Sequence, residues 1–373
     1  MTDTLKALMD ERASAPDFAR PDLDVVRAAG TRRRRRRRAV NAGGALAGTA
    51  AVTALVVGLT TGGGVVDAGP DVATDVPSQP QPLGPSWAVG TTIHDGDREI
   101  QVGHPVRAYV RTSLGFVTVD DRGRVWSVVD AGEEQVGTVD DAEFPRVESD
   151  PSSSLVAWVG SQGARRDPVA VVHDQADGTT TTYGLTPVPR GRPSDGTDPT
   201  EVIALADGVL YVRDDTRAIA IDLASGDRSV VDDAVTFESG PVDAAAGRVA
   251  FVDTTGPTFS VGRTRSTAGP SYAVSGYDGS LSPDAGFVAF TEDDGGVYDT
   301  ATGTAVDLGL TGFFEPVEWW DATTLALVAE SAPGSGVGVL LRCDVVAASC
   351  RTVAQLGTFD ELGDDFVAPT GSS

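Results

Sequence analysis

Hydrophobic residues follow two different patterns along this chain. Residues 39–59 form one run without a charged side chain, in which one asparagine and two threonines are the polar residues. As a helix this run would be about 31 Å long at ~1.5 Å per residue, which matches the ~30 Å hydrocarbon core of a bilayer. The pattern therefore predicts one transmembrane helix over residues 39–59.

An arginine cluster directly precedes this run. It consists of Arg32, Arg33, Arg34, Arg35, Arg36, Arg37 and Arg38. Because such charges keep their end of a first span in the cytoplasm, we predict a cytoplasmic basic head over residues 1–38 and an extracytoplasmic remainder. Val66-Asp67-Ala68 fits a signal-peptidase site, so a cleaved signal is the alternative. We favour an uncleaved anchor, since a head of this length is long for a signal peptide.

A linker and a repeating region follow. Residues 60–86 contain five glycines and five prolines without apolar periodicity, which predicts a linker. Beyond the linker, three windows of nine residues align without a gap: 150–158 (DPSSSLVAW), 243–251 (DAAAGRVAF) and 282–290 (SPDAGFVAF). Each is a turn that leads into a short strand with an aromatic residue at its end.

Three looser copies extend the repeat. The six windows end at Val119, Trp158, Tyr211, Phe251, Phe290 and Leu327, and successive ends are 39, 53, 40, 39 and 37 residues apart. A period near 40 with strand-forming residues is typical of the four-stranded blades of a β-propeller. The long step contains a polar, Pro- and Gly-rich segment around residues 186–200, which we expect to be an exposed loop.

Hairpins with a common turn follow three of the windows, at residues 172–178, 221–227 and 298–304. Asp suits such a turn because its side chain accepts hydrogen bonds from the nearby backbone, and Gly because it adopts positive φ. These hairpins predict the outer two strands of each blade.

The two ends of the repeat are complementary. One more period ends near Phe366 and Val367, where a blade would begin without outer strands, while residues 87–93 and 98–102 form an outer hairpin without inner strands. Pairing them completes a seventh blade and leaves no open sheet edge. We therefore predict an all-β propeller of seven four-stranded blades over residues 87–368, with a tail over 369–373. Six blades and a separate hairpin are the alternative.

The windows S-P-D-x-G-x-V-A-F and W-W-D-x-x-T-L resemble the repeats of TolB-like and WD-like β-propellers. The resemblance covers about three quarters of the chain, and it implies the fold rather than a function, since propellers serve as binding scaffolds and as enzymes. The head, arginine cluster and span are similar to those of actinobacterial membrane proteins encoded near extracytoplasmic-function sigma factors. The head contains neither His nor Cys, so it lacks the zinc site of the better-known anti-sigma domains.

Charge divides unevenly along the chain. The head carries 11 basic and 6 acidic residues, a net charge of +5, and the whole chain carries −25, so the remainder carries −30. An exported domain this acidic should repel nucleic acid and anionic lipid. The two cysteines, Cys343 and Cys350, have six residues between them, which places them on facing strands of an outer hairpin. We predict a structural disulfide worth about 2 kcal/mol.

Candidate chemistry is sparse. Neither G-x-S-x-G nor H-E-x-x-H occurs, and we expect the histidines, His94, His104 and His173, to be peripheral surface residues. The acidic segments 95–97 and 292–295 lack the ligand spacing of a calcium loop, so no cofactor is predicted and calcium is the alternative. One aromatic cluster packs between blades or forms a binding platform at the channel mouth: Phe313, Phe314, Trp319 and Trp320.

These observations favour a single-pass protein of the cell membrane whose propeller acts outside the cytoplasm as a non-enzymatic binding or scaffold module. Its partner would be a protein, a peptide or an envelope component such as a glycan. In one alternative, the propeller senses an envelope ligand and the head regulates a cytoplasmic partner such as a sigma factor. In another, carboxylates in the channel make it a hydrolase or lyase.

Overall fold

The computed structural model describes residues 84–143, 145–163, 167–186, 200–236, 239–274, 278–291, 296–310, 314–358 and 366–369. The predicted head, span, arginine cluster and most of the linker lie outside these ranges, as do residues 187–199 of the predicted loop. Within these ranges, no helix is long and apolar enough to cross a membrane. The transmembrane helix over residues 39–59 therefore stays a prediction.

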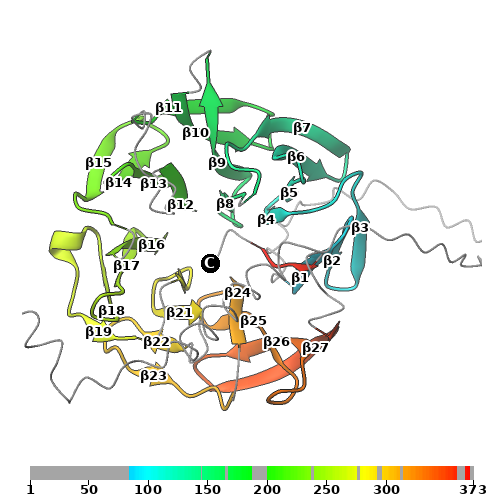
Figure 1. Cartoon of the computed structure of the whole chain (residues 1–373), viewed down its shortest axis with the longest axis vertical. Helices are drawn as coiled ribbons and strands as arrows, with labels where there is room; N and C mark the ends of the chain where they lie inside the picture. Colours follow the sequence, from blue (N-terminus) through cyan, green and yellow to red (C-terminus); the bar gives the residue numbers. More distant parts are fainter. Residues whose placement is uncertain are drawn as a thin grey trace, which may run out of the picture. The chain divides into compact units, whose positions relative to one another are not determined.

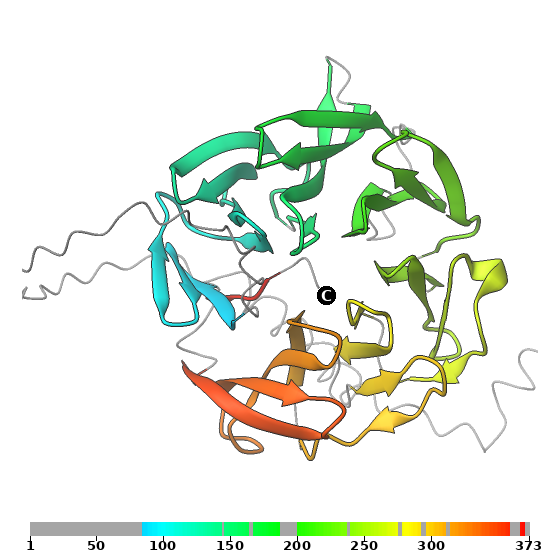
Figure 2. The same cartoon turned by 180° about the vertical axis from the view of Figure 1, so that it is seen from behind.

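The described strands form seven sheets of four strands each. The sheets stand around a central axis as the blades of a propeller, seen from its two faces in Figures 1 and 2. All strand pairs are antiparallel in these sheets, and within blades 1 to 6 the strands follow one another in sequence order. The predicted all-β, seven-bladed fold is confirmed.

Six blades are continuous in sequence. Blade 1 comprises β4 (Ala108–Thr112), β5 (Gly115–Val119), β6 (Arg124–Val129) and β7 (Gly132–Thr138); blade 2, β8 (Val147–Ser149), β9 (Leu155–Gln162), β10 (Asp167–Asp174) and β11 (Thr180–Gly184); and blade 3, β12 (Thr200–Ala206), β13 (Val209–Asp214), β14 (Arg217–Asp222) and β15 (Arg228–Asp232). Blade 4 comprises β16 (Ser239–Ala245), β17 (Arg248–Asp253), β18 (Thr258–Gly262) and β19 (Tyr272–Ala273), with the short helix η1 (Arg265–Thr267) before β19; blade 5, β20 (Asp278–Leu281), β21 (Phe287–Thr291), β22 (Val297–Asp299) and β23 (Ala305–Val306); and blade 6, β24 (Phe314–Trp319), β25 (Thr324–Glu330), β26 (Val337–Asp344) and β27 (Ser349–Thr358).

Blade 7 joins the two ends of the ring. It contains β28 (Phe366–Val367), β1 (Ser86–Val89), β2 (Thr92–Asp95) and β3 (Arg98–Gln101), in that order across the sheet. The predicted closure from both ends is confirmed, but the division differs. Residues 87–93 do not form one strand, because the chain turns at Gly90 and Thr91, so the N-terminal side supplies three strands and the C-terminal side one.

In blades 1 to 6, each repeated window covers the turn that precedes the second strand and continues into that strand. All six window ends are buried, with exposed fractions between 0% and 7%. Trp158, Phe251, Phe290 and Leu327 pack against the preceding blade. Val119 and Tyr211 instead pack against the following blade. Successive residues of a strand point to opposite faces, so the looser copies that end at Val119 and Tyr211 were aligned one residue out of register.

The predicted outer turns share one structure. In blades 3 and 5, Asp222 Oδ1 and Asp299 Oδ1 each accept hydrogen bonds from two backbone N–H groups of the turn at 2.8–3.0 Å. Gly226 and Gly303 occupy the fifth position of these turns with φ of 76° and 68°. Blade 6 has the same turn after Asp344, but its fifth residue is Ala348, with φ of 50°.

This difference predicts opposite effects at one position of the turn. Ala348→Gly should raise the free energy of unfolding by about 0.5–1 kcal/mol, because glycine has no Cβ to clash at positive φ. Gly226→Ala should lower it by about 1 kcal/mol for the same reason. Urea denaturation of both variants beside the unmodified protein checks this, and a loss of stability in Ala348→Gly would contradict it.

The closing strand gives a second prediction. Removal of residues 366–373 should lower the free energy of unfolding by about 3 kcal/mol, because it exposes the edge of β1 and takes apolar side chains from the cores on both sides of blade 7. Removal of residues 370–373 alone is the matched control. Equal urea midpoints for the two shortened chains would show that β28 is not needed for closure.

Candidate functional site

Polar side chains occupy one repeated position on the innermost strands. We call Glu148 of β8, Asp243 of β16, Ser280 of β20 and Glu318 of β24 the inner polar positions. Each is paired across the ladder with an alanine of the second strand, namely Ala157, Ala250, Ala289 and Ala326. These alanines are buried and pack against the following blade. Because cross-strand partners share a face, the small methyl group leaves room there for a polar side chain.

At the join of the ring, Glu318 belongs to a network that spans three blades. Arg111 of β4 places Nη1 2.9 Å from Asp95 Oδ1 of β2 and Nε 3.7 Å from Glu318 Oε1, and its Nη2 donates to Gly84 O at 3.0 Å. The guanidinium is buried, and it is 5.3 Å from the centre of the Phe116 ring. One arginine therefore connects blades 1, 6 and 7.

Two hydroxyl groups extend this network. Tyr109 donates to Ser86 Oγ at 3.2 Å, and Ser86 acts to lower the pKa of Glu318. Burial raises the pKa of Glu318 to about 7, although Arg111 and the indole of Trp320 act to lower it. Burial likewise raises the pKa of Tyr109 well above its ordinary value. Glu318 can therefore gain or lose a proton near neutral pH.

Asp243 connects blades 4 and 5. Its Oδ2 accepts from the backbone N–H of Leu281 at 2.6 Å, and its Oδ1 from that of Ala244 at 2.7 Å. Desolvation raises the pKa of Asp243 to about 7, although these two N–H groups act to lower it. In the next blade, the Ser280 hydroxyl is buried and has no hydrogen-bond partner among the described residues.

Glu148 lies in an acidic neighbourhood. Its side chain is buried, and this burial raises its pKa well above the ordinary value. The negative charges of Asp243 and Glu201 raise the pKa further, and the positive charge of Arg146 lowers it. Glu201 itself is paired twice, with Arg146 Nη1 and Arg213 Nε, each at 3.2 Å. The carboxyl groups of Glu148 and Asp243 thus influence each other, and that of Glu201 is neutralised by its two arginines.

This arrangement can hold protons close to neutral pH, because three of its carboxyl groups resist ionisation. Groups with such perturbed pKa values gather at functional sites, although ion-pair networks produce them too. No group of three or more His, Cys, Asp or Glu side chains within the described ranges is arranged to hold a metal ion.

The sequence suggested that the histidines are surface residues, but two of the three are buried. His104 and His173 are 5% and 4% exposed, because each finds a threonine partner: His104 Nε2 lies 2.8 Å from Thr118 Oγ1, and His173 Nδ1 lies 3.1 Å from Thr180 Oγ1. Burial lowers the pKa of His173. His94 is partly exposed and stacks on Trp87, with the ring centres 4.7 Å apart.

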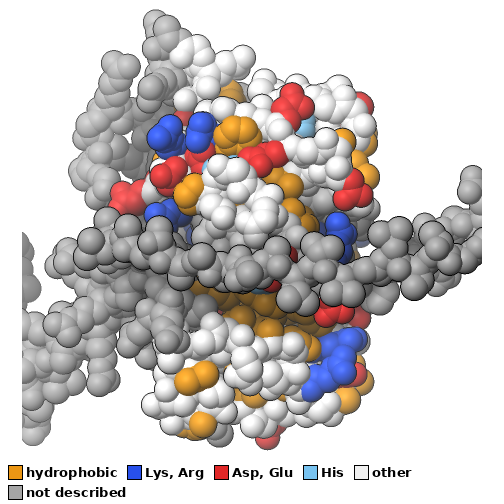
Figure 3. Space-filling view, turned by 90° about the vertical axis from the view of Figure 1, so that its right-hand side faces the viewer, with side chains coloured by type: hydrophobic (Ala, Val, Ile, Leu, Met, Phe, Trp, Pro, Cys, Tyr) orange, Lys and Arg blue, Asp and Glu red, His pale blue; other side chains and the backbone are white. Residues whose placement is uncertain are grey.

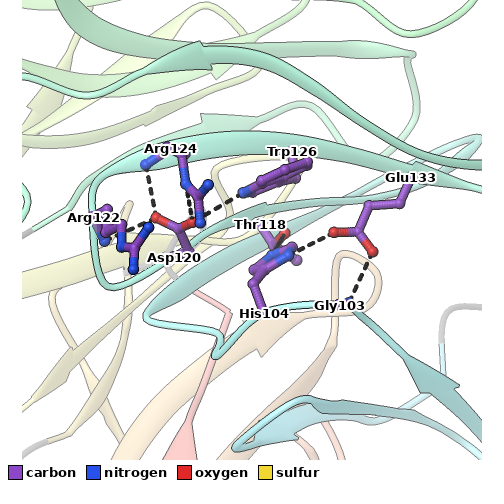
Figure 4. A network of polar contacts seen from close by, with 8 residues as sticks. All are labelled: Gly103, His104, Thr118, Asp120, Arg122, Arg124, Trp126 and Glu133. Carbon is purple, nitrogen blue, oxygen red and sulfur yellow. Dashed lines mark hydrogen bonds and ion pairs between the residues drawn. The ribbon is translucent and has the colours of Figure 1, made fainter.

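His104 belongs to a polar network in blade 1 (Figure 4). Its Nδ1 lies 2.6 Å from Glu133 Oε1, and its ring stacks on Trp126 at 5.0 Å. Asp120, which is fully buried, accepts from the backbone of Arg122 and Arg124, from Arg124 Nε at 2.6 Å and from Trp126 Nε1 at 3.2 Å. Burial acts to raise the pKa of Asp120, but these hydrogen bonds lower it below its ordinary value. The network holds together the turn between β5 and β6.

The predicted disulfide is present. Cys343 of β26 and Cys350 of β27 are directly opposite one another and bonded through their sulfur atoms. Phe314, Trp319 and Trp320 are 9%, 4% and 8% exposed and pack into the cores on the two faces of blade 6, which leaves little ring surface for a ligand. Phe313, residues 292–295 and the arginine cluster lie outside the described ranges.

The exposed surface carries both signs of charge. On the flank that Figure 3 presents, acidic and arginine side chains are interspersed among polar and hydrophobic ones. The net charge of the chain beyond its head is nevertheless −30, as the sequence requires.

Comparisons with known proteins find similarity only among solved structures, at low identity. No family model matches the chain, and no curated protein matches it. Among solved structures, TolB from Acinetobacter baumannii is 14% identical, with 71% of this chain and 67% of that chain covered and a TM-score of 0.37. U3-55K is 11% identical, with 69% and 83% covered and a TM-score of 0.44. Hsv2 from Kluyveromyces lactis is 12% identical, with 64% and 74% covered and a TM-score of 0.41. The seven-bladed fold itself follows from the strand pairing of the chain.

Glu148 predicts a pH dependence of stability. Because its pKa is raised by folding, its favourable contribution is complete below the unfolded pKa near 4.3 and is lost as the pH rises toward the folded pKa. Glu148→Gln cannot ionise, so its stability relative to the unmodified protein should increase with pH, by up to about 1.4 kcal/mol per pH unit within that window. Urea denaturation between pH 5 and pH 8 checks this.

Glu143→Gln, which changes an exposed carboxyl group, is the matched control for this experiment. Its stability relative to the unmodified protein should not follow the trend of Glu148→Gln. Parallel pH curves for Glu148→Gln and the unmodified protein would contradict the raised pKa.

Proposed function

We propose that this chain is a membrane-anchored protein whose propeller lies outside the cytoplasm and binds a protein, peptide or envelope component without transforming it. The observation that carries the location is the disulfide between Cys343 and Cys350. Structural disulfides persist in oxidising compartments and are rare in the cytosol. The arginine cluster followed by an uncharged apolar run supplies the matching anchor in the sequence.

The binding role is supported by how the inner charged groups are used. Arg111 and Glu318 join blades 1, 6 and 7, Asp243 joins blades 4 and 5, and Glu201 pairs with Arg146 and Arg213. These contacts connect blades of the ring to one another. Propellers commonly serve as such binding or scaffold modules.

The raised pKa values of Glu148 and Asp243 favour a second candidate, a hydrolase or lyase that uses inner carboxyl groups as acid and base. The two candidates differ in the effect of Glu148→Gln. A binding module keeps its ligand unchanged with or without the substitution, whereas an enzyme converts the ligand and loses that conversion in the variant.

Protease protection on intact cells, with a tag at each end of the full chain, tests the location. The C-terminal tag should be digested from outside, while a fragment with the N-terminal tag stays protected until the cells are permeabilised. A C-terminal tag that is protected in intact cells and digested only after permeabilisation would contradict the proposal.

The same cells give a second measurement. The chain has two cysteines, so thiol alkylation of the acid-quenched, denatured protein should modify it only after reduction. Release of a mature protein that begins near Gly69 would keep the propeller outside the cytoplasm but remove the anchor. It would also exclude the alternative in which the head regulates a cytoplasmic partner such as a sigma factor.

A further inference from the structure

Blade 4 departs from the common outer turn. In blades 3 and 5 the third and fourth strands are joined by residues 223–227 and 300–304, whereas in blade 4 they are joined by residues 263–271, which include η1. A pocket of about 790 Å³, largely open to solvent, lies between this longer connection and the turn from β16 to β17. Pockets of 300–1,000 Å³ are the size of small-molecule sites. The lining residues are Ala246, Gly247, Arg248, Val261, Gly262, Arg263, Thr267 and Gly269.

One wall of the pocket is firmly held. Gly262 permits η1 to lie against β18, because a Cβ at this position would come within 2.4 Å of Ala268 Cα. The backbone N–H of Gly269 donates to Val261 O at 3.0 Å. Arg265 ties η1 to β15 of blade 3, with Nε 3.2 Å from Asp232 Oδ2, and to β16 of its own blade, with Nη2 2.6 Å from Ser239 Oγ. The η1 side of the pocket is therefore fixed by contacts within the protein.

Two arginines line the same pocket. Val249 pairs with Gly262 at the end of the β17–β18 ladder, so Arg248 and Arg263 occupy the next, opposed positions. Like charges directly opposite each other on neighbouring strands destabilise a sheet. Within the described part of the chain, neither arginine forms an ion pair, although the protein is strongly acidic. Arg248 donates one hydrogen bond, from Nη1 to Ala285 O at 3.3 Å, and Arg263 is exposed.

We propose that this pocket binds an organic molecule through an oxyanion group, a phosphate ester or a carboxylate, held between Arg248 and Arg263. Guanidinium groups bind both kinds of oxyanion through paired hydrogen bonds. The pocket is much larger than one inorganic ion, so the remainder of the ligand, such as a sugar ring, fills the space beside the glycines that line it. The inference deepens the proposed binding role by naming a site and a ligand class.

Three sugars that differ in charge provide the test: glucose, glucuronate and glucose 1-phosphate, titrated into the full chain by calorimetry at low ionic strength. At least one charged sugar should bind about tenfold or more tightly than glucose, because each charge-assisted hydrogen bond adds substantially to affinity. The sugar that binds identifies the oxyanion. Equal binding of all three sugars would overturn the proposal.

Variants assign the binding to this pocket. Arg263→Gln should remove most of the preference for the charged sugar, whereas Arg228→Gln, which changes an exposed arginine of β15, should keep it. An equal loss in both variants would show general attraction to surface charge and would overturn the site. Because the test measures binding and not location, its failure leaves the protease-protection result unaffected.

Thermal unfolding separates the site from a folding defect. Without ligand, Arg263→Gln should melt at or above the temperature of the unmodified protein, because it relieves the repulsion with Arg248. The bound sugar should raise the melting temperature of the unmodified protein but not of the variant. A lower melting temperature for the ligand-free variant, with the response to ligand retained, would contradict the proposed role of the two charges.

Discussion

The sheets of this propeller form a ring only because its first and last strands pair with each other. β1 and β28 are joined over two residue pairs, Ala88 with Val367 and Val89 with Phe366. Those few pairs place the apolar side chains of blade 7 in two cores at once, one shared with blade 1 and one with blade 6. An unpaired β1 would present its free backbone groups at an open sheet edge. Arg111 reinforces the same join from the inner side through ion pairs to two blades.

The inner strands contain a conflict between packing and charge. Carboxyl groups are costly to bury, and the protein accommodates them beside alanines. Asp243 also lies next to an N–H group of the neighbouring blade, and Glu318 next to Arg111 of blade 1. The compensation is incomplete, since the pKa values of Asp243 and Glu318 are raised to about 7. Departures of this kind from an apolar core are expected where a structure serves more than its own stability.

Much of the fold could be predicted because its signals are local and repeated. The windows, the Asp- and Gly-containing turns and the cysteine spacing each concern residues close together in sequence, and the structure contains all three features. The turn at Gly90 and Thr91 was missed because it interrupts a short apolar run that looks like one strand. Val119 and Tyr211 were assigned to the wrong face because strands have a period of two, so an error of one residue reverses every side chain.

The inner polar positions were not predictable in the same way. The first strands of the blades, which carry these positions, lack a repeated motif. One indirect signal was available: four windows have an alanine just before their final residue, and this small side chain leaves space for a larger one on the paired strand. The arginine pocket depends on the opposition of Arg248 and Arg263, which only the register of β17 and β18 brings together.

The division of blade 7 also sets the order in which the protein can mature. β1, β2 and β3 are the first strands of the ring to be synthesised, and they have to wait for β28, which follows all the other strands in sequence. During synthesis, and during any passage across a membrane, this three-stranded sheet has no inner neighbour. The acidic character of the chain beyond its head would then keep waiting molecules apart, since like net charge opposes association between copies. Closure of the ring is therefore a late step of folding, and any factor that delays the synthesis of β28 also delays completion of blade 7.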